Sequence, residues 1–347
     1  MANKGWQGNF FEDFELGQVV DCPVPRTVTS GDVSTYIALT GDRTPVYCGA
    51  SGFVHPLVTF HTVFGQTVRH ISLNARANLG YAGIRWHEPA RIGDTLSMQL
   101  EIVGLRENSN NETGIVYVRN TATNQHGQVV MTFWRWVMIR KRSTTPTRWL
   151  DNPVIPELPS QVEASELRVN VDAIPTQRQT GGRFRFDDYA VGERVLHFDG
   201  QTLNHSDHMS FTRLFQNSAK VHFDAVMTNG KPLIYGGVPI SLGYAMALNG
   251  FENRVGIAGI NSGAHTAPVH SGDTVYAFTD VLEKAVLPGS DVGALRLRMV
   301  CVKNVDPAGR DDAESWPVQI PHPKKPGALV YNENVILDLD YWELMPR

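Results

Sequence analysis

The sequence predicts an α+β protein made of two repeats, each with an antiparallel sheet wrapped around a long central helix. The first observation is an internal repeat: a shift of 175 residues places residues 13–17 on the similar residues 188–192. Secondly, each repeat contains an apolar, sparsely charged segment, residues 53–72 and 234–249, of the kind that forms a buried helix. Thirdly, runs rich in Val, Ile and aromatic residues follow each segment, with turn residues between them, as in an antiparallel meander.

The two repeats are expected to form two similar domains joined by a linker. Residues 1–142 form the first predicted domain and residues 183–347 the second. Residues 143–182 hold five prolines and the pair Gly181-Gly182, with few apolar periodic positions, which is typical of a linker. Two similar domains in one chain favour pairing side by side about a pseudo-twofold axis.

In the first repeat the predicted elements follow a regular order. Residues 19–28 have the composition of a strand. Thr29 with Asp32 three residues later is typical of a capped helix start, so a short helix is expected to follow. Pro45 disfavours helix in the segment that follows this short helix. The buried helix at residues 53–72 then precedes three strands, predicted at residues 95–104, 114–123 and 128–141.

The second repeat is expected to follow the same order. Residues 204–215 correspond to the short helix and residues 234–249 to the buried helix. Residues 304–334 form an extra polar, proline-rich loop. Strands are predicted at residues 275–282, 294–302 and 335–344.

Composition excludes several classes of function. Hydrophobic residues make up 42% of the chain and charged residues 19%, and the formal net charge is −4, so we expect no nucleic-acid-binding surface. No apolar run reaches the roughly 18 residues of a membrane span and the first residues lack an apolar signal core, so we expect no membrane association. Cys22, Cys48 and Cys301 lack metal-ligand spacing and are expected to be reduced thiols of a cytoplasmic protein.

The repeat places two related sequence boxes in register. Residues 41–48 read GDRTPVYC and residues 216–224 read QNSAKVHFD. The same shift aligns Asp42 with Asn217 and Tyr47 with His222. An acid and a histidine five positions apart are therefore divided between the repeats, the acid in the first and the histidine in the second.

The repeated unit and its G-D-x-x-P-x-(H) box resemble the MaoC-like, (R)-specific enoyl-CoA hydratases, which have the hot-dog fold. The resemblance covers nearly the whole chain and implies a double hot-dog. More narrowly, residues 72–83 (SLNARANLGYAG), 213–217 (RLFQN) and 235–237 (YGG) resemble the mesaconyl-CoA hydratases, also called β-methylmalyl-CoA dehydratases. In this family an Asp and a His hold the water that adds to a 2-enoyl-CoA, and a glycine N–H at the start of the central helix binds the thioester oxygen.

The resemblance assigns the active site to the second repeat. His222 is the expected acid/base residue, because an imidazole titrates in the range needed for proton transfer. Asn217 stands where the family usually has aspartate, so it is expected to position water without taking its proton. Gly236 is expected to donate its N–H to the thioester oxygen, with Gly237 beside it. Tyr235 is expected to pack under the thioester.

The first repeat is expected to hold a degenerate site that has a structural or CoA-binding role. Tyr47 replaces the histidine, and a phenol is a poor base at neutral pH. Pro56 aligns with Gly236 and has no N–H to donate. Asp42 is interpreted as a helix cap or a remnant, because the two boxes of a pseudo-symmetric pair are expected in separate clefts.

A mesaconyl thioester carries a free carboxylate, which needs a cationic partner when it is buried. Arg213 is one candidate, because it lies four residues before Asn217 and would share a face with it if the short helix runs that far. Lys220 is the other candidate. A solvent-facing position is the alternative for each.

The resemblance therefore predicts a hydro-lyase that reversibly hydrates a branched dicarboxylic 2-enoyl-CoA, mesaconyl-CoA to β-methylmalyl-CoA. The alternatives are a hydratase of simple 2-enoyl-CoA thioesters, a hot-dog acyl-CoA thioesterase, and a non-catalytic CoA-thioester binding protein. No cofactor is expected, and no metal site either, because His205 and His208 have no third ligand nearby in the sequence. The acyl-CoA substrate is the expected partner, and a dimer of double hot-dogs the expected assembly.

Overall fold

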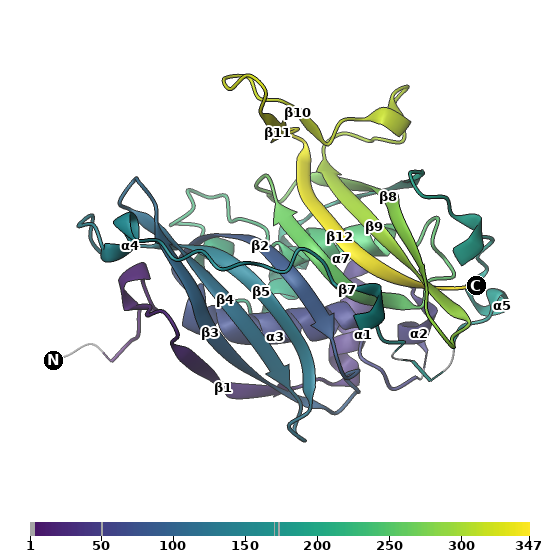
Figure 1. The fold of residues 1–347 in the computed structure, drawn as a ribbon, viewed down its shortest axis with the longest axis horizontal. Helices are drawn as coiled ribbons and strands as arrows, with labels where there is room; N and C mark the ends of the chain where they lie inside the picture. Colours follow the sequence, from purple (N-terminus) through teal and green to yellow (C-terminus); the bar gives the residue numbers. More distant parts are fainter. Residues whose placement is uncertain (1–3, 50, 170, 173) are drawn as a thin grey trace.

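The centre of the molecule is one ten-stranded sheet that curves around two helices (Figure 1). This computed structural model describes residues 4–49, 51–169, 171–172 and 174–347. The helices are α3 (Pro56–Ile71) in the first half and α7 (Gly237–Met246) in the second. All of α7 and most of α3 are buried on the concave side of the sheet, because α7 is apolar on nearly every face and α3 carries one permanently charged side chain, Arg69, near its end.

The sheet is antiparallel and consists of two five-stranded halves. From one edge to the other its strands are β1 (Val19–Thr27), β3 (Thr95–Glu107), β4 (Thr113–Thr123), β5 (Val129–Arg140), β2 (Ala75–Trp86), β7 (Gly256–His265), β12 (Val335–Pro346), β9 (Val292–Lys303), β8 (Thr274–Val286) and β6 (Arg194–Thr202). The second five strands repeat the first five in mirror order, so the pseudo-twofold axis passes between β2 and β7. The predicted α+β fold, a sheet around a central helix in each repeat, is confirmed.

Shorter elements connect these layers. The helices are α1 (Ser30–Thr40), α2 (Pro45–Cys48), α4 (Arg148–Asp151), α5 (Gln177–Thr180) and α6 (His205–Leu214). Single 3₁₀ turns are η1 (Phe11–Asp13), η2 (Ala164–Glu166), η3 (Phe186–Asp188), η4 (Lys220–His222) and η5 (Ala313–Ser315). The extra loop carries the small hairpin of β10 (Gln319–Pro321) and β11 (Leu329–Tyr331), which projects from the body (Figure 1). Across the described ranges, no helix combines the length and the apolar character that crossing a membrane requires.

The start of α1 is capped as its sequence predicts. Thr29 accepts a hydrogen bond from the backbone N–H of Asp32, and the Asp32 carboxylate accepts one from the Thr29 N–H at 2.8 Å. The prediction that Pro45 disfavours helix was wrong, because α2 begins at this residue. Pro45 occupies the first position of α2, where a backbone N–H would have no intrahelical partner and its absence costs nothing.

The junction between β2 and β7 was not among the predicted strands, and it positions the site. β2 pairs with β7 only from Gly80, opposite Ala264, to Arg85, opposite Gly259. Residues 75–79 of β2 pair with β5 alone. The two halves of the sheet therefore part beside this stretch, and a space opens between them.

The linker packs on the outer face of the sheet (Figure 1). Val162 and Leu167 are buried in an apolar cluster with Trp342, and the Trp342 indole N–H donates to the Val162 carbonyl at 2.8 Å. The Val162 N–H in turn donates to the side chain of Asn261 in β7. The linker thus packs against the second half of the sheet on its outer face. The division into domains at residues 1–142 and 183–347 stays a prediction.

Candidate active site

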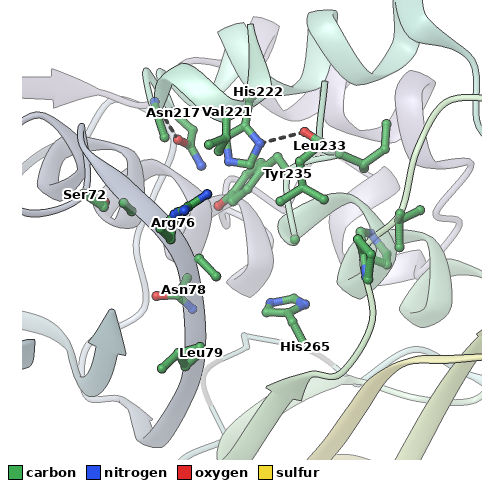
Figure 2. A pocket seen from close by; sticks show the side chains of 18 of the residues that line it. Ser72, Arg76, Asn78, Leu79, Asn217, Val221, His222, Leu233, Tyr235 and His265 are labelled. Atoms are coloured by element: carbon green, nitrogen blue, oxygen red, sulfur yellow. Dashed lines mark hydrogen bonds between the residues drawn. The ribbon is translucent and has the colours of Figure 1, made fainter. Parts of the chain in front are cut away.

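A cavity of about 330 Å³ opens where β2 and β7 part, and both halves of the chain line it (Figure 2). The first half contributes residues of α3 and residues 75–79 of β2. The second half contributes the turn around residues 217–222, the start of α7 and the end of β7. The site is therefore composite, although the sequence assigned its catalytic residues to the second half alone.

The chain reverses sharply to bring Asn217 to the cavity. α6 ends at Leu214, and Gln216 has a φ of 54°, in the left-handed region where Asn and Gly are more usual. The Asn217 side chain is buried, and its carbonyl oxygen accepts a hydrogen bond from the Ala219 N–H at 3.2 Å. No hydrogen bond within the described ranges uses the Asn217 amide nitrogen, so this donor is left for a molecule in the cavity.

The first half supports this turn directly. Gly65 of α3 lies so close to it that a Cβ on Gly65 would stand 1.7 Å from the carbonyl oxygen of Phe215. Only glycine permits this approach. The central helix of the first half, α3, therefore fixes the position of the turn that carries Asn217.

His222 is held in one tautomer at the cavity wall. Its Nδ1 lies 2.8 Å from the Leu233 carbonyl oxygen, which can only accept, so Nδ1 carries the proton and Nε2 has a free lone pair. The side chain is buried, and this burial lowers the pKa of His222 to about 4 despite the opposing hydrogen bond. At neutral pH the imidazole is uncharged and able to accept a proton.

Tyr235 and Gly236 form the floor of the cavity at the start of α7. The Tyr235 ring lies beside the His222 ring, with 5.7 Å between centroids, and its hydroxyl is 3.2 Å from Nδ1 of His61. Gly236 precedes the first residue of α7 and lines the cavity, and no described residue accepts a hydrogen bond from its N–H. The N–H of Gly236 is thus available at the positive end of the helix.

Gly237 lies deeper than its neighbour. A Cβ on Gly237 would meet the rings of His61 and Tyr235 at 2.7 Å, and Gly237 is outside the cavity lining. Its position indicates close packing. Of the glycine pair, Gly236 alone faces the cavity.

His265 is a lining residue that the sequence did not identify. It stands at the end of β7, and its Nε2 lies 3.1 Å from the Tyr81 hydroxyl. Burial lowers the pKa of His265 to about 4. A Cβ on Gly236 would lie 2.5 Å from this ring, so the imidazole borders the helix start. In the part of the chain that the structure describes, no three His, Cys, Asp or Glu side chains are placed to hold a metal ion.

The two cations expected to meet a substrate carboxylate lie outside the cavity lining. α6 ends before Asn217, so Arg213 does not share a helix face with it and is exposed instead. Lys220 donates from Nζ to the Asn74 side chain at 2.9 Å and to the Gln7 carbonyl oxygen at 3.3 Å. The structure therefore does not bring either cation to the cavity.

Arginines of the first half stand at the cavity instead. Arg76 of β2 lines it, and Arg135 of β5 lies one layer behind its wall. The Arg135 guanidinium is fully buried, 4.4 Å over the Phe64 ring, and its Nη2 is 3.5 Å from the Ser72 hydroxyl. Burial lowers the pKa of Arg135 to about 10, which leaves it charged at pH 7. Its positive potential beneath the wall favours an anionic ligand in the cavity.

The corresponding place in the first half is filled by a buried ion pair. Asp42 is nearly inaccessible, and its Oδ2 lies 3.3 Å from Nη2 of Arg254 and 3.3 Å from Nε2 of His55. Burial would raise the pKa of Asp42, but Arg254 and His55 together hold it far below its usual range. The pocket beside Tyr47 measures only about 30 Å³. Asp42 thus lies apart from His222, in a cluster that occupies its own cleft.

Replacing Arg254 with methionine is expected to lower the free energy of unfolding by about 3–5 kcal/mol, because the Asp42 carboxylate would remain buried without its cation. Urea denaturation followed by circular dichroism measures the change. The double variant Arg254→Met/Asp42→Asn is the matched control and should recover part of the loss, since it removes both charges. A single variant as stable as the unmodified chain would show that the pair is not coupled.

Comparison with known proteins agrees with this architecture. The sequence profile of the mesaconyl-CoA hydratase family matches residues 2–307. The chain is 42% identical to the β-methylmalyl-CoA dehydratase of Chloroflexus aurantiacus, over 100% of this chain and 99% of that one. It is 43% identical to the mesaconyl-CoA hydratase of Cereibacter sphaeroides, over 98% of both chains.

Solved structures share the fold. A MaoC domain protein dehydratase from Chloroflexus aurantiacus superposes with a TM-score of 0.90 at 40% identity, covering 100% of this chain and 99% of that one. Rv0216 of Mycobacterium tuberculosis, a double hot-dog protein, superposes with a TM-score of 0.71 at 23% identity over 98% and 99% of the two chains. The chain therefore belongs to the mesaconyl-CoA hydratase family, within the double hot-dog proteins of MaoC type.

Proposed function

We propose that the protein catalyses the reversible addition of water to mesaconyl-CoA, giving β-methylmalyl-CoA. The observation that supports this most strongly is a single cavity lined by two groups. One is a neutral His222 with its proton on Nδ1 and a lone pair on Nε2, and the other is the N–H of Gly236 at a helix start. Relatives of 42% and 43% identity over the whole chain bear the names of this dehydratase and this hydratase. The reaction is a hydro-lyase reaction of the enoyl-CoA hydratase type.

The thioester carbonyl is proposed to lie at the start of α7. A hydrogen bond from the Gly236 N–H, assisted by the positive end of the helix, would draw electrons toward the carbonyl oxygen. This makes C3 of the conjugated 2-enoyl group electrophilic. The same hydrogen bond becomes stronger as negative charge develops on the oxygen, so it stabilises the enolate more than the substrate.

His222 is proposed to move the proton. Its Nε2 takes a proton from water while the water oxygen bonds to C3, and the imidazolium then returns the proton to C2 of the enolate. Both transfers use one residue and so occur on one face of the substrate. Asn217 donates from its amide nitrogen to hold the water or hydroxyl group. Because an amide cannot accept the proton, the chemistry depends on His222.

The assignment is tested with the purified protein in assays of hydration, substrate preference, thiol release and ligand binding. Mesaconyl-CoA should lose its enoyl-thioester absorbance, with β-methylmalyl-CoA identified by chromatography. Crotonyl-CoA, which lacks the free carboxylate, should react more slowly; the reverse preference would indicate a hydratase of simple enoyl-CoA thioesters. Release of free thiol, detected with a disulfide reagent, would indicate a thioesterase. Binding without any of these reactions would indicate a non-catalytic role and exclude the proposal.

The pH dependence of kcat/KM follows from the burial of His222. The lowered pKa of about 4 means that the free enzyme loses its base only as the pH falls through that value, and the ordinary histidine range near 6.5 has no effect. We expect kcat/KM to stay constant between about pH 5.5 and pH 8. Circular dichroism at each pH separates this limb from unfolding. An acidic limb between pH 6 and 7 in the folded protein would contradict the assigned base.

Further properties are proposed on the same basis. No cofactor is needed, since acid–base chemistry beside a polarised thioester carbonyl is sufficient. The three cysteines are free thiols, which supports a cytoplasmic location. A homo-oligomer, a dimer of double hot-dogs, stays our expectation, and sedimentation would measure it.

A further inference from the structure

We propose that Arg76 and Asn78 of β2 form the receptor for the free carboxylate of the substrate. The half of the chain that lacks the catalytic histidine would then decide which enoyl-CoA is used. The inference rests on the proposed function, because it requires a dicarboxylic substrate. It replaces Arg213 and Lys220, which the sequence suggested for this role.

Arg76 is distinguished by its charge and by its lack of partners. Among the described residues that line the cavity, it is the one side chain with a permanent charge. It forms no ion pair with any Asp or Glu that the structure describes, whereas arginines on other strands, such as Arg296 and Arg298, are paired with aspartates. Figure 2 shows its guanidinium extending from β2 toward the side of the cavity that carries Asn217 and His222. The Arg76 side chain is exposed and, unlike Arg213, also lines the cavity, and an unpaired guanidinium at a cavity is a ready site for a carboxylate.

Asn78 adds an unpaired amide to the same wall. Both its Oδ1 and its Nδ2 are buried and have no hydrogen-bond partner within the described ranges. Buried polar atoms without partners are uncommon, because each loses its hydrogen bonds to water. Asn78 lies two residues after Arg76, and both line the cavity. A carboxylate oxygen held by Arg76 could accept a further hydrogen bond from the Asn78 amide nitrogen.

The chemistry of the substrate places its carboxylate near the water. In a dicarboxylic 2-enoyl thioester with a four-carbon main chain, the carboxylate is attached to C3, whichever end carries CoA. C3 is also the carbon that receives water. The carboxylate must therefore lie within one bond of the atom attacked beside His222 and Asn217. Arg76 extends toward this end of the cavity (Figure 2). Its positive charge would also reduce the repulsion between the carboxylate and the incoming oxygen.

Two roles for Arg76, binding the substrate carboxylate or binding a phosphate of CoA, can be distinguished by comparing two substrates. If Arg76 bound a phosphate of CoA, every CoA thioester would depend on it equally. (E)-2-methylcrotonyl-CoA is the matched probe, since it differs from mesaconyl-CoA only by a methyl group in place of the carboxylate. Its reaction uses the same CoA, the same carbonyl and the same double bond.

The test compares the unmodified protein with Arg76→Gln on both substrates. We expect kcat/KM for mesaconyl-CoA to fall about 100-fold, while kcat/KM for (E)-2-methylcrotonyl-CoA stays within about threefold. Arg76→Lys should recover part of the activity with mesaconyl-CoA, because it keeps the charge but not the planar fork of donors. Arg178→Gln is the control, because Arg178 is exposed on α5, outside the cavity lining. Thermal denaturation verifies that each variant is folded.

Asn78→Asp gives an independent reading at the same wall. A second carboxylate beside the receptor would repel the substrate carboxylate, so the loss should again be selective for mesaconyl-CoA. Equal losses on both substrates, or none on either, in Arg76→Gln would overturn the receptor assignment. Failure of the unmodified protein to hydrate mesaconyl-CoA would instead overturn the proposed function, and the two results are distinguishable.

Discussion

Replacing His222 with glutamine is expected to lower kcat for mesaconyl-CoA hydration by about 10²–10⁴-fold, the range typical of a general acid–base residue. Glutamine has a similar length and can still donate a hydrogen bond to the Leu233 carbonyl oxygen, which His222 Nδ1 contacts at 2.8 Å. It has no group that takes a proton from water at neutral pH. The loss should therefore appear in kcat, with KM little changed, because His222 is assigned to the water and the proton and not to CoA.

The control for this variant is His205→Gln. His205 is exposed on α6 and lies outside the cavity lining, so its replacement should leave both constants unchanged. Steady-state rates over a range of mesaconyl-CoA concentrations, with circular dichroism to establish folding, are sufficient. If His222→Gln kept nearly the full rate, the base would have to be another group, and His265 is the other imidazole in the cavity lining.

Asn217 should matter less than His222. Asn217→Ala removes one hydrogen-bond donor to the water, so a loss of about tenfold is expected, in keeping with a neutral hydrogen bond. A larger loss than that of His222→Gln would indicate that the turn itself, fixed against Gly65, is the essential feature. The ranking of the two variants thus separates proton transfer from positioning.

Most of the fold was predictable because local signals and the repeat agreed. The capping pair Thr29 and Asp32 marked the start of α1, and the apolar segment at residues 53–72 contained α3. The strands that the sequence missed were β2 and β7 of the large sheet and the hairpin strands β10 and β11 in the extra loop. β7 reads GIAGINSGAH, a glycine-rich run without the composition of a strand, and its pairing with β2 comes from the packing of the two halves.

The sequence predicted only cavity residues that belong to the second repeat. His222, Asn217 and Gly236 stand in aligned boxes, so shift and resemblance could identify them, and they line one cavity. Arg76 and His265 could not be found in this way. They belong to strands from different halves, and only the separation of β2 from β7 exposes them to the same space.

The cleft at the Asp42 box and the cleft at the Asn217 box differ in net charge. At the first-half box Arg254 from the second half of the chain pairs with Asp42, so the two charges neutralise each other, and the pocket beside Tyr47 is small. At the second-half box the aligned residue is the neutral Asn217, and Arg76 from the first half of the chain pairs with no acidic side chain that the structure describes. The open cleft thus retains a positive charge for an anionic ligand, which accords with a dicarboxylic substrate.

Replacing Gly236 with proline is expected to reduce kcat about 10²–10³-fold, the usual effect of losing one donor to a developing oxyanion. The comparison that isolates the N–H is with Gly236→Ala. Both variants add a Cβ that would lie 2.5 Å from the His265 ring, so both require that ring to shift, but alanine keeps the N–H. The Cβ contact is common to both variants, so the rate ratio between them reports the replacement of the N–H by the proline ring.

The backbone is compatible with this substitution. Gly236 has a φ of −57°, within the range that proline imposes, and the first half already carries Pro56 at the start of its own central helix. CoA binding, measured by calorimetry, should be similar in the two variants, because the thioester oxygen is absent from free CoA. Equal kcat values for the alanine and proline variants would show that the thioester oxygen is bound elsewhere, and the carbonyl would then have to be placed away from the start of α7.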